Sequence, residues 1–212
     1  MFTTAFDDFT PADFSHWIYN DRYIEADHEY ADIRPRYNAD AIKDMFGAHK
    51  DISVLDYGGG SGLLGQLLRN CGFSDVDSYD PFVAEFARRP ERRYAMVLAF
   101  EVIEHSTKPR EVFADLVSLT APGGIIVFST MVQTAEIQRA GVQWWYVSPR
   151  NGHVSFHSGQ SMKMLADEHG LQWRTNSEGS LHVMHTTIPD FAQKVLRRPV
   201  TPAPVDTTRR AP

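Results

Sequence analysis

A run of glycines directly after a short apolar segment constrains this chain more than any other feature. Residues Ile52–Tyr57 read ISVLDY, and the GGGSG of Gly58–Gly62 follows at once. An apolar run that ends in glycines predicts a buried strand entering a tight turn. Residues 63–71 then have helical spacing and stop at Gly72. The turn therefore leads into a helix, whose free N–H groups and positive dipole end favour an anionic or polar ligand group.

The remainder of the chain alternates between strand and helix patterns. This alternation predicts a parallel sheet with helices on both faces, which binds ligands at the carboxyl ends of its strands. The expected strands are Val76–Asp80, Tyr94–Phe100 and Gly124–Thr130, the expected helices are Phe82–Arg88, Pro109–Leu119 and Gly159–His169, and 171–176 with 181–187 form a closing hairpin.

Three regions are expected along the chain. Residues 1–48 are aromatic and charged and form an N-terminal helical cap or lid, broken at Arg34-Pro35 because a residue before proline avoids the helical conformation. The second of its helices runs toward Gly47. Residues 49–190 form the ligand-binding domain. Residues 191–212 are expected to be a disordered tail, because the stretch from Arg197 is rich in proline, threonine and arginine and cannot bury a core.

Charge and composition exclude several classes. The net charge is −6 and no dense Lys/Arg stripe is present, which disfavours a nucleic-acid partner. The N-terminus has no basic region before an apolar run, so it is not a secretory signal, and no apolar run approaches the roughly 20 residues of a membrane span. A single cysteine, Cys71, suits a reducing cytoplasm. The oligomeric state stays open.

Two carboxylates narrow the class of ligand. Because Gly60, Gly62 and Gly65 also fit the GxGxxG pattern of dinucleotide folds, the glycines alone leave a dehydrogenase open. Asp56, two residues before the first glycine, is the discriminating feature. Asp80 ends the next strand, where a carboxylate can accept two hydrogen bonds from a ribose diol or cap the helix that follows.

Two further motifs complete a pattern. Glu101–His105 reads EVIEH after the third strand, and residues 121–124 read APGG before the fourth. In order and spacing, the four motifs resemble those of class I S-adenosylmethionine-dependent methyltransferases, over residues 52–187. The resemblance implies an α/β fold with a doubly wound, Rossmann-like sheet of the seven-strand type, order 3-2-1-4-5-7-6 with the last strand antiparallel. Only a short stretch separates Asp80 from Tyr94, so the third, edge strand is expected to be missing or shortened.

The resemblance also implies how S-adenosylmethionine binds. Its methionine end is expected over the glycines, its ribose on Asp80 and its adenine near Phe82 and Phe100. The predicted cofactor-binding residues are Asp56, Gly58, Gly59, Gly60, Gly62, Asp80, Pro81, Phe82, Phe100 and Glu101.

Two histidines are candidates for catalysis. His153 and His157 lie in the long segment after the fourth predicted strand, beyond the aromatic run 144–146. In the family this segment carries residues that bind the methyl acceptor, and a histidine there can act as a general base. Alternatively, the aromatic side chains only pack this segment onto the sheet.

A divalent metal is an alternative reading of the EVIEH segment. Glu101, Glu104 and His105 at i, i+3 and i+4 would share one helical face, and with His153 they form a set suited to Mg, Mn or Zn. This set resembles that of metal-dependent small-RNA 2'-O-methyltransferases and ubiquinone-pathway O-methyltransferases. The same string occurs in metal-free relatives, where the first glutamate faces the cofactor.

The sequence therefore predicts an S-adenosylmethionine-dependent methyltransferase with a small-molecule or sugar-like (glycan) acceptor. O-methylation is favoured because a histidine near the acceptor can serve as base. The alternatives are a metal-assisted RNA 2'-O-methyltransferase, a non-catalytic nucleotide-binding scaffold on the same fold, and an NAD-dependent dehydrogenase.

Overall fold

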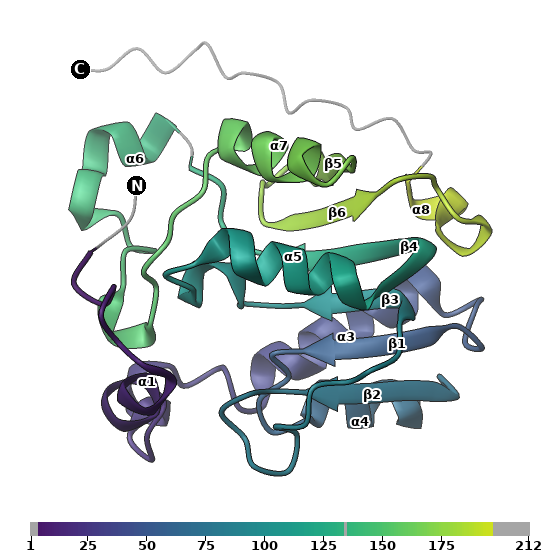
Figure 1. Cartoon of the computed structure of the whole chain (residues 1–212), viewed down its shortest axis with the longest axis horizontal. Coiled ribbons are helices and arrows are strands. Elements are labelled where there is room, and N and C mark those ends of the chain that lie inside the picture. The colour runs from purple at the N-terminus through teal and green to yellow at the C-terminus, as the bar shows by residue number, and fades with distance from the viewer. Residues whose placement is uncertain (1–3, 134, 197–212) are drawn as a thin grey trace.

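The sheet is the centre of the molecule, seen here in a computed structural model that describes residues 4–133 and 135–196 (Figure 1). Within these residues it has six strands in the order β2-β1-β3-β4-β6-β5. Strands β1 to β4 are parallel, and β6 is antiparallel to both β4 and β5. The strands are β1 (Ser53–Tyr57), β2 (Asp75–Tyr79), β3 (Tyr94–Ala99), β4 (Thr120–Ser129), β5 (Gln172–Thr175) and β6 (Leu181–His185).

Helices cover both faces of this sheet, and each face has its own apolar core. Side chains alternate along the strands, so Val54 belongs to the core on the face covered by α3 and α4, while its neighbour Leu55 belongs to the core on the face covered by α5 and α7. The α-helices are α1 (Pro11–Trp17), α2 (Tyr23–Ala26), α3 (Ile33–Phe46), α4 (Leu63–Asn70), α5 (Pro109–Leu119), α6 (Ala135–Ala140), α7 (Gly159–Glu168) and α8 (Gln193–Leu196), with 3-10 turns η1 (Ile103–His105), η2 (Gly141–Gln143), η3 (Pro149–Asn151) and η4 (Asp190–Ala192).

The strand order confirms the predicted fold class, including the missing edge strand. Residues 81–93, all of which the structure describes, contain neither a strand nor a helix. The helix expected at 82–88 is therefore wrong. The backbone N–H of Asp80 donates to the carbonyl of Phe86, which folds this segment back over the strand end instead of letting it continue as a helix.

The returning segment also protects the open edge that the missing strand leaves. Arg92 donates to the carboxylates of Asp75 and Asp77, both on β2, and its guanidinium lies 4.6 Å from the ring centroid of Tyr94. Charged side chains along an edge strand discourage pairing with other chains. The sheet can therefore end at β2.

Elements near the two expected domain boundaries pack onto the sheet. Ile42 and Phe46 of α3 are fully buried against the sheet, so α3 packs in the sheet layer, and residues 4–32, which precede it, are called the cap below. Helix α3 begins at Ile33, with Pro35 in its first turn, where a missing N–H costs nothing. At the other end, Leu196 of α8 packs into the core, so packed structure extends past residue 191. The part of the expected tail at 197–212 lies outside the described residues. Among those described, no helix combines the length and the apolarity needed to cross a membrane.

A buried histidine on β6 makes the fold sensitive to acid. His182 is fully buried between the rings of Phe128 and Trp173, and its Nε2 donates to the carbonyl of Thr130. Burial lowers the pKa of His182 to about 4. Between pH 6.5 and about pH 4, His182 binds a proton in the unfolded chain but not in the folded chain. The free energy of unfolding therefore falls as the pH falls.

We expect replacement of His182 by Phe to remove this part of the acid sensitivity. From pH 6.5 toward 4, the free energy of unfolding of the native chain should fall more steeply than that of His182→Phe, by up to about 1.4 kcal/mol per pH unit. Urea titrations at several pH values measure both slopes. Parallel slopes for the two proteins would contradict the assignment.

Candidate active site

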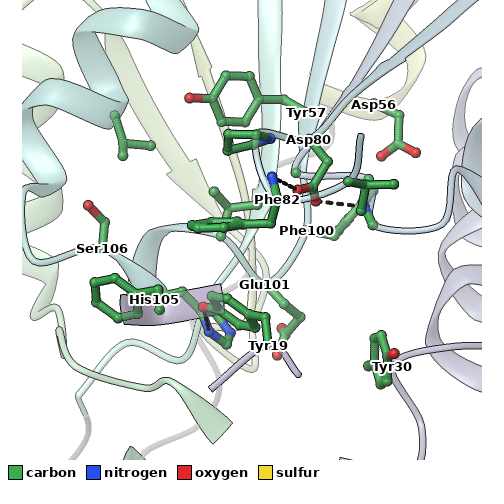
Figure 2. A pocket seen from close by; sticks show the side chains of 18 of the residues that line it. Tyr19, Tyr30, Asp56, Tyr57, Asp80, Phe82, Phe100, Glu101, His105 and Ser106 are labelled. Carbon is green, nitrogen blue, oxygen red and sulfur yellow. Dashed lines mark hydrogen bonds between the residues drawn. The ribbon is translucent and has the colours of Figure 1, made fainter. Parts of the chain in front are cut away.

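A cavity of about 790 Å³ opens at the carboxyl ends of β1, β2 and β3, between the sheet and the N-terminal cap (Figure 2). This is the edge of the sheet at which ligands were expected. Nine of the ten residues predicted to bind the cofactor line the cavity: Asp56, Gly58, Gly59, Gly60, Asp80, Pro81, Phe82, Phe100 and Glu101.

The glycine turn packs so closely that side chains are excluded from most of it. A Cβ on Gly58, which has φ +71°, would lie 2.5 Å from a methyl carbon of Val102. A Cβ on Gly59 would lie 2.4 Å from the carboxylate of Asp56. Gly62 is the tenth predicted residue, and it does not line the cavity. It precedes α4 with φ +73°, and a Cβ there would lie 2.6 Å from the ring of Phe86. A glycine at position 62 therefore allows Phe86 to pack against the start of α4.

Asp56 supports the turn from beneath. Its side chain is buried under Gly59 and accepts a hydrogen bond from the backbone N–H of Gly65. Burial raises the pKa of Asp56 to about 7. Asp56 therefore supports the wall of the cavity from behind, and its carboxylate does not project into the cavity.

Asp80 joins two parts of the cavity wall. One carboxylate oxygen accepts from the N–H of Gly60 at 2.9 Å and the other from the N–H of Phe82 at 2.8 Å, as the dashed lines in Figure 2 show. A carboxylate has about four lone-pair positions, so these bonds leave acceptor capacity for a ribose diol. Phe82 presents an exposed ring at the same point. A free acceptor beside an exposed aromatic face fits the nucleoside end of S-adenosylmethionine.

Glu101 is held in a strained backbone conformation at the cavity wall. Among the described residues, it is the single non-glycine residue with positive φ, at +54°. Its N–H donates to Ser129 Oγ at 2.8 Å, and Ser129 Oγ donates back to Glu101 Oε1 at 2.9 Å. Arg34 of α3 lines the same cavity, with Nη1 3.4 Å from Glu101 Oε2. Residues held in such conformations cluster at functional sites.

Sequence reasoning missed Arg34, Asp27 and Ser129. Arg34 also pairs with the buried carboxylate of Asp27. The contacts of Glu101 with Arg34 and Ser129 span 67 and 28 residues. A local spacing pattern cannot predict contacts between residues this far apart in the sequence.

The histidines are distributed differently from the prediction. His105, expected as a metal ligand, lines the cavity, and its Nδ1 lies 3.0 Å from the hydroxyl of Tyr19 in the cap. His153, 5% exposed, lies behind it with ring centroids 4.9 Å apart, and its Nδ1 bonds to the carbonyl of Tyr146. His157 lines a second cavity of about 570 Å³ beside the start of α7. Neither predicted catalytic histidine therefore lines the cavity that holds the glycine turn.

Three of the four predicted metal ligands come together. One possible ligand atom from each of Glu104, His105 and His153 lies within 4.8 Å of the other two. Glu101 is not in this group, because the expected helical turn starts only at Ile103 and the positive φ of Glu101 directs its carboxylate to Ser129. The prediction that Glu101, Glu104 and His105 share one helical face is wrong, while His153 does join Glu104 and His105.

The buried cluster has unusual protonation. Glu104 is fully buried and accepts a 2.5 Å hydrogen bond from the hydroxyl of Tyr146. Burial raises the pKa of Glu104 to about 8, and burial together with the neighbouring His153 lowers the pKa of His105 well below 6.5. At neutral pH, His105 is therefore uncharged and can accept a proton.

Comparison with known proteins identifies the class. Residues 30–176 match the family described as "Methyltransferase domain", and the chain belongs to this family. The match confirms the predicted superfamily, the class I S-adenosylmethionine-dependent methyltransferases.

The chain is also similar to individual proteins. It is 26% identical to a ubiquinone biosynthesis O-methyltransferase of Rickettsia bellii over 54% of this chain, and it spans 57% of the length of that relative. It is 26% identical to the protein of that name from Maricaulis maris over 68% of each chain.

Solved structures agree on the fold. The magnesium protoporphyrin IX methyltransferase of Synechocystis, solved with bound S-adenosylmethionine, aligns with a TM-score of 0.54 at 13% identity, covering 86% of this chain and 94% of that one. An O-methyltransferase family protein from Burkholderia thailandensis aligns with a TM-score of 0.57 at 13% identity, covering 86% and 64%.

The packing of the glycine turn yields a paired test. We expect Gly58→Ala to destabilise the fold by several kcal/mol, because the new Cβ clashes with Val102 in a backbone conformation that already disfavours alanine. Gly60→Ala, which has φ +53° but nothing within 4 Å of the new Cβ, should cost about 1 kcal/mol. Chemical denaturation compares the two, and equal losses would show that steric packing does not distinguish them.

Proposed function

We propose that this chain transfers the methyl group of S-adenosylmethionine to a hydroxyl oxygen of a small, flat, largely apolar acceptor. One observation carries the proposal: a single cavity is lined by the predicted cofactor residues, a neutral histidine and an aromatic wall. The similarity to O-methyltransferases supports the choice of oxygen. The single cysteine supports a cytoplasmic setting.

The cap supplies the acceptor side of the cavity. Phe9, Phe14 and Tyr19 line the cavity from the cap. Aromatic walls suit a planar ring better than a sugar, whose hydroxyls need many polar partners. This observation favours a phenolic over a glycan acceptor.

The reaction requires the protein to align the acceptor with the methyl group and to remove one proton. S-adenosylmethionine supplies a methyl group that its sulfonium already activates. The cavity walls hold the acceptor hydroxyl in line with that group. His105 takes the hydroxyl proton as the oxygen–carbon bond forms and the carbon–sulfur bond breaks, with Tyr19 holding the imidazole by its Nδ1. This proposal moves the role of base from His153 and His157 to His105.

We expect His105→Asn to lower kcat with catechol about a hundredfold while leaving the Kd of S-adenosylhomocysteine within twofold, because the variant loses the base but not the cofactor wall. The native enzyme should keep its activity below pH 6.5, since the pKa of His105 is lowered and the neutral form persists into acid. Radiolabelled methyl transfer and calorimetric titration measure these quantities.

Two comparisons make this test decisive. His169→Asn, at the far end of α7, is the matched control and should behave as the native chain. If His153→Ala abolishes turnover and His105→Asn does not, the base is misassigned. If S-adenosylhomocysteine does not bind and NAD does, the proposed function itself fails.

A metal-assisted reaction is the second candidate, and the grouping of Glu104, His105 and His153 is the observation that favours it. Two histidines and a carboxylate suit a transition metal. If this group holds a metal, EDTA should remove activity, and Zn²⁺ or Mn²⁺ should restore it in the native chain but not in His153→Ala. Full activity in chelator, with no metal in elemental analysis of the purified protein, would rule out this candidate.

A further inference from the structure

The second cavity, of about 570 Å³, adjoins the cavity that holds the glycine turn. Asp7, Thr107 and Lys108 line both cavities, so these three residues form a wall that the two share. The rest of the lining of the second cavity comes from the start of α5 and from described residues between 133 and 161, none of which lines the first cavity. A molecule that passes the shared wall therefore meets a different part of the chain.

The second cavity is polar where the first is aromatic. Four of its lining residues carry hydroxyl groups: Thr107, Ser155, Ser158 and Ser161. Aromatic walls suit a flat ring, and hydroxyl groups suit a polar substituent. An acceptor that reaches across the shared wall can therefore place its ring in the first cavity and a polar end in the second.

Two helices begin at the second cavity. Lys108 is the N-cap of α5 and Ser158 is the N-cap of α7, and both residues line the cavity. The start of a helix carries the positive end of its dipole, and its first N–H groups have no partner within the helix. Two helix starts and a lysine at one cavity favour an anionic group there.

Lys108 is an unusual residue for the position that it occupies. An N-cap side chain normally accepts a hydrogen bond from the first turn, which an ammonium cannot do, and Lys108 makes no such bond. The helix dipole also disfavours a cation at this end. The ion pair with Glu111, at 3.4 Å, is about two-thirds exposed and offsets little of this cost. Residues that break a local rule in this way occur at functional sites.

The other ionisable residues of the second cavity leave this preference in place. Asp7 is exposed, so water and salt screen its carboxylate. His157 is 6% exposed, and burial lowers its pKa to about 4, so it carries no charge at neutral pH. Its Nε2 is buried without a hydrogen-bond partner among the described residues, and a bound molecule would supply one.

We propose that the second cavity binds a carboxylate at the end of the methyl acceptor, and that Lys108 selects for it. The inference rests on the proposed function and narrows its substrate class to phenols with a short acidic side chain. The ring lies against the aromatic wall, and the carboxylate lies between the starts of α5 and α7. A carboxylate can accept hydrogen bonds from the ammonium of Lys108 and from helix N–H groups at the same time.

Three catechols of similar length test the charge preference. Dihydrocaffeate ends in a carboxylate, 4-propylcatechol in a methyl group and dopamine in an ammonium. We expect the native chain to have a kcat/KM for dihydrocaffeate about tenfold higher than for 4-propylcatechol, because the acid gains a charge-assisted hydrogen bond. Dopamine should be the poorest of the three. Radiolabelled methyl transfer measures all three constants.

Two variants test whether Lys108 sets this preference. Lys108→Met should reduce the ratio of the constants for dihydrocaffeate and 4-propylcatechol to less than twofold, and Lys108→Glu should make dopamine a better acceptor than dihydrocaffeate. Neither change removes a capping bond, so both variants should fold. Lys163→Met is the matched control, because Lys163 is also exposed and pairs with an acid on its own helix, Asp167, but lines neither cavity. It should keep the native ratio.

The outcomes separate this inference from the proposed function. Equal constants for the three acceptors in the native chain, a preference for dopamine, or an unchanged ratio in Lys108→Met would overturn the inference and leave the proposed function standing. If the native chain methylates none of the three catechols, the proposed function fails and this inference fails with it.

Discussion

The ligand side of this molecule depends on one carboxylate. Asp80 accepts from the backbone of Gly60 with one oxygen and from that of Phe82 with the other. It thereby ties the turn after β1 to the segment after β2. In a parallel sheet these two turns leave the same edge, and their N–H groups point at whatever lies between them. A carboxylate at that point satisfies them and sets the distance between the two walls of the cavity. Asp56 does the same for the turn from below, at the cost of a buried acid whose pKa is raised.

Features with a local signature could be predicted from the sequence. Alternating apolar runs and helical spacings predicted the strands and a parallel sheet, and the resemblance to a known family implied the strand order. Nine of the ten residues predicted to bind the cofactor line the cavity, and they come from motifs that each occupy a few consecutive positions. The helix expected at 82–88 was wrong because one hydrogen bond, from Asp80 to Phe86, reverses the chain there. Helix propensity does not predict a hydrogen bond of this kind.

The contacts that complete the site join distant parts of the chain. Tyr19 and His105 are 86 residues apart, and Arg34 and Glu101 are 67 apart. Periodicity placed Glu101, Glu104 and His105 on one helical face, but a single backbone angle separates them. Glu101 turns to the cavity and Ser129, while Glu104 enters a buried cluster with Tyr146. The five residues of the EVIEH motif therefore lie in two different environments, and their spacing in the sequence does not distinguish the two.

The absent edge strand has a consequence for how this protein recognises its cofactor. The nucleoside side of the cavity is bounded there by Pro81 and Phe82, both of which are exposed, and by a short return segment that contributes neither helix nor strand. A purine bound on this side of the cavity would therefore meet few groups of the protein, and substituents on the base would project toward solvent instead of into a packed wall. If S-adenosylmethionine binds as proposed, analogues of the cofactor that carry a modified base should fit this side of the cavity.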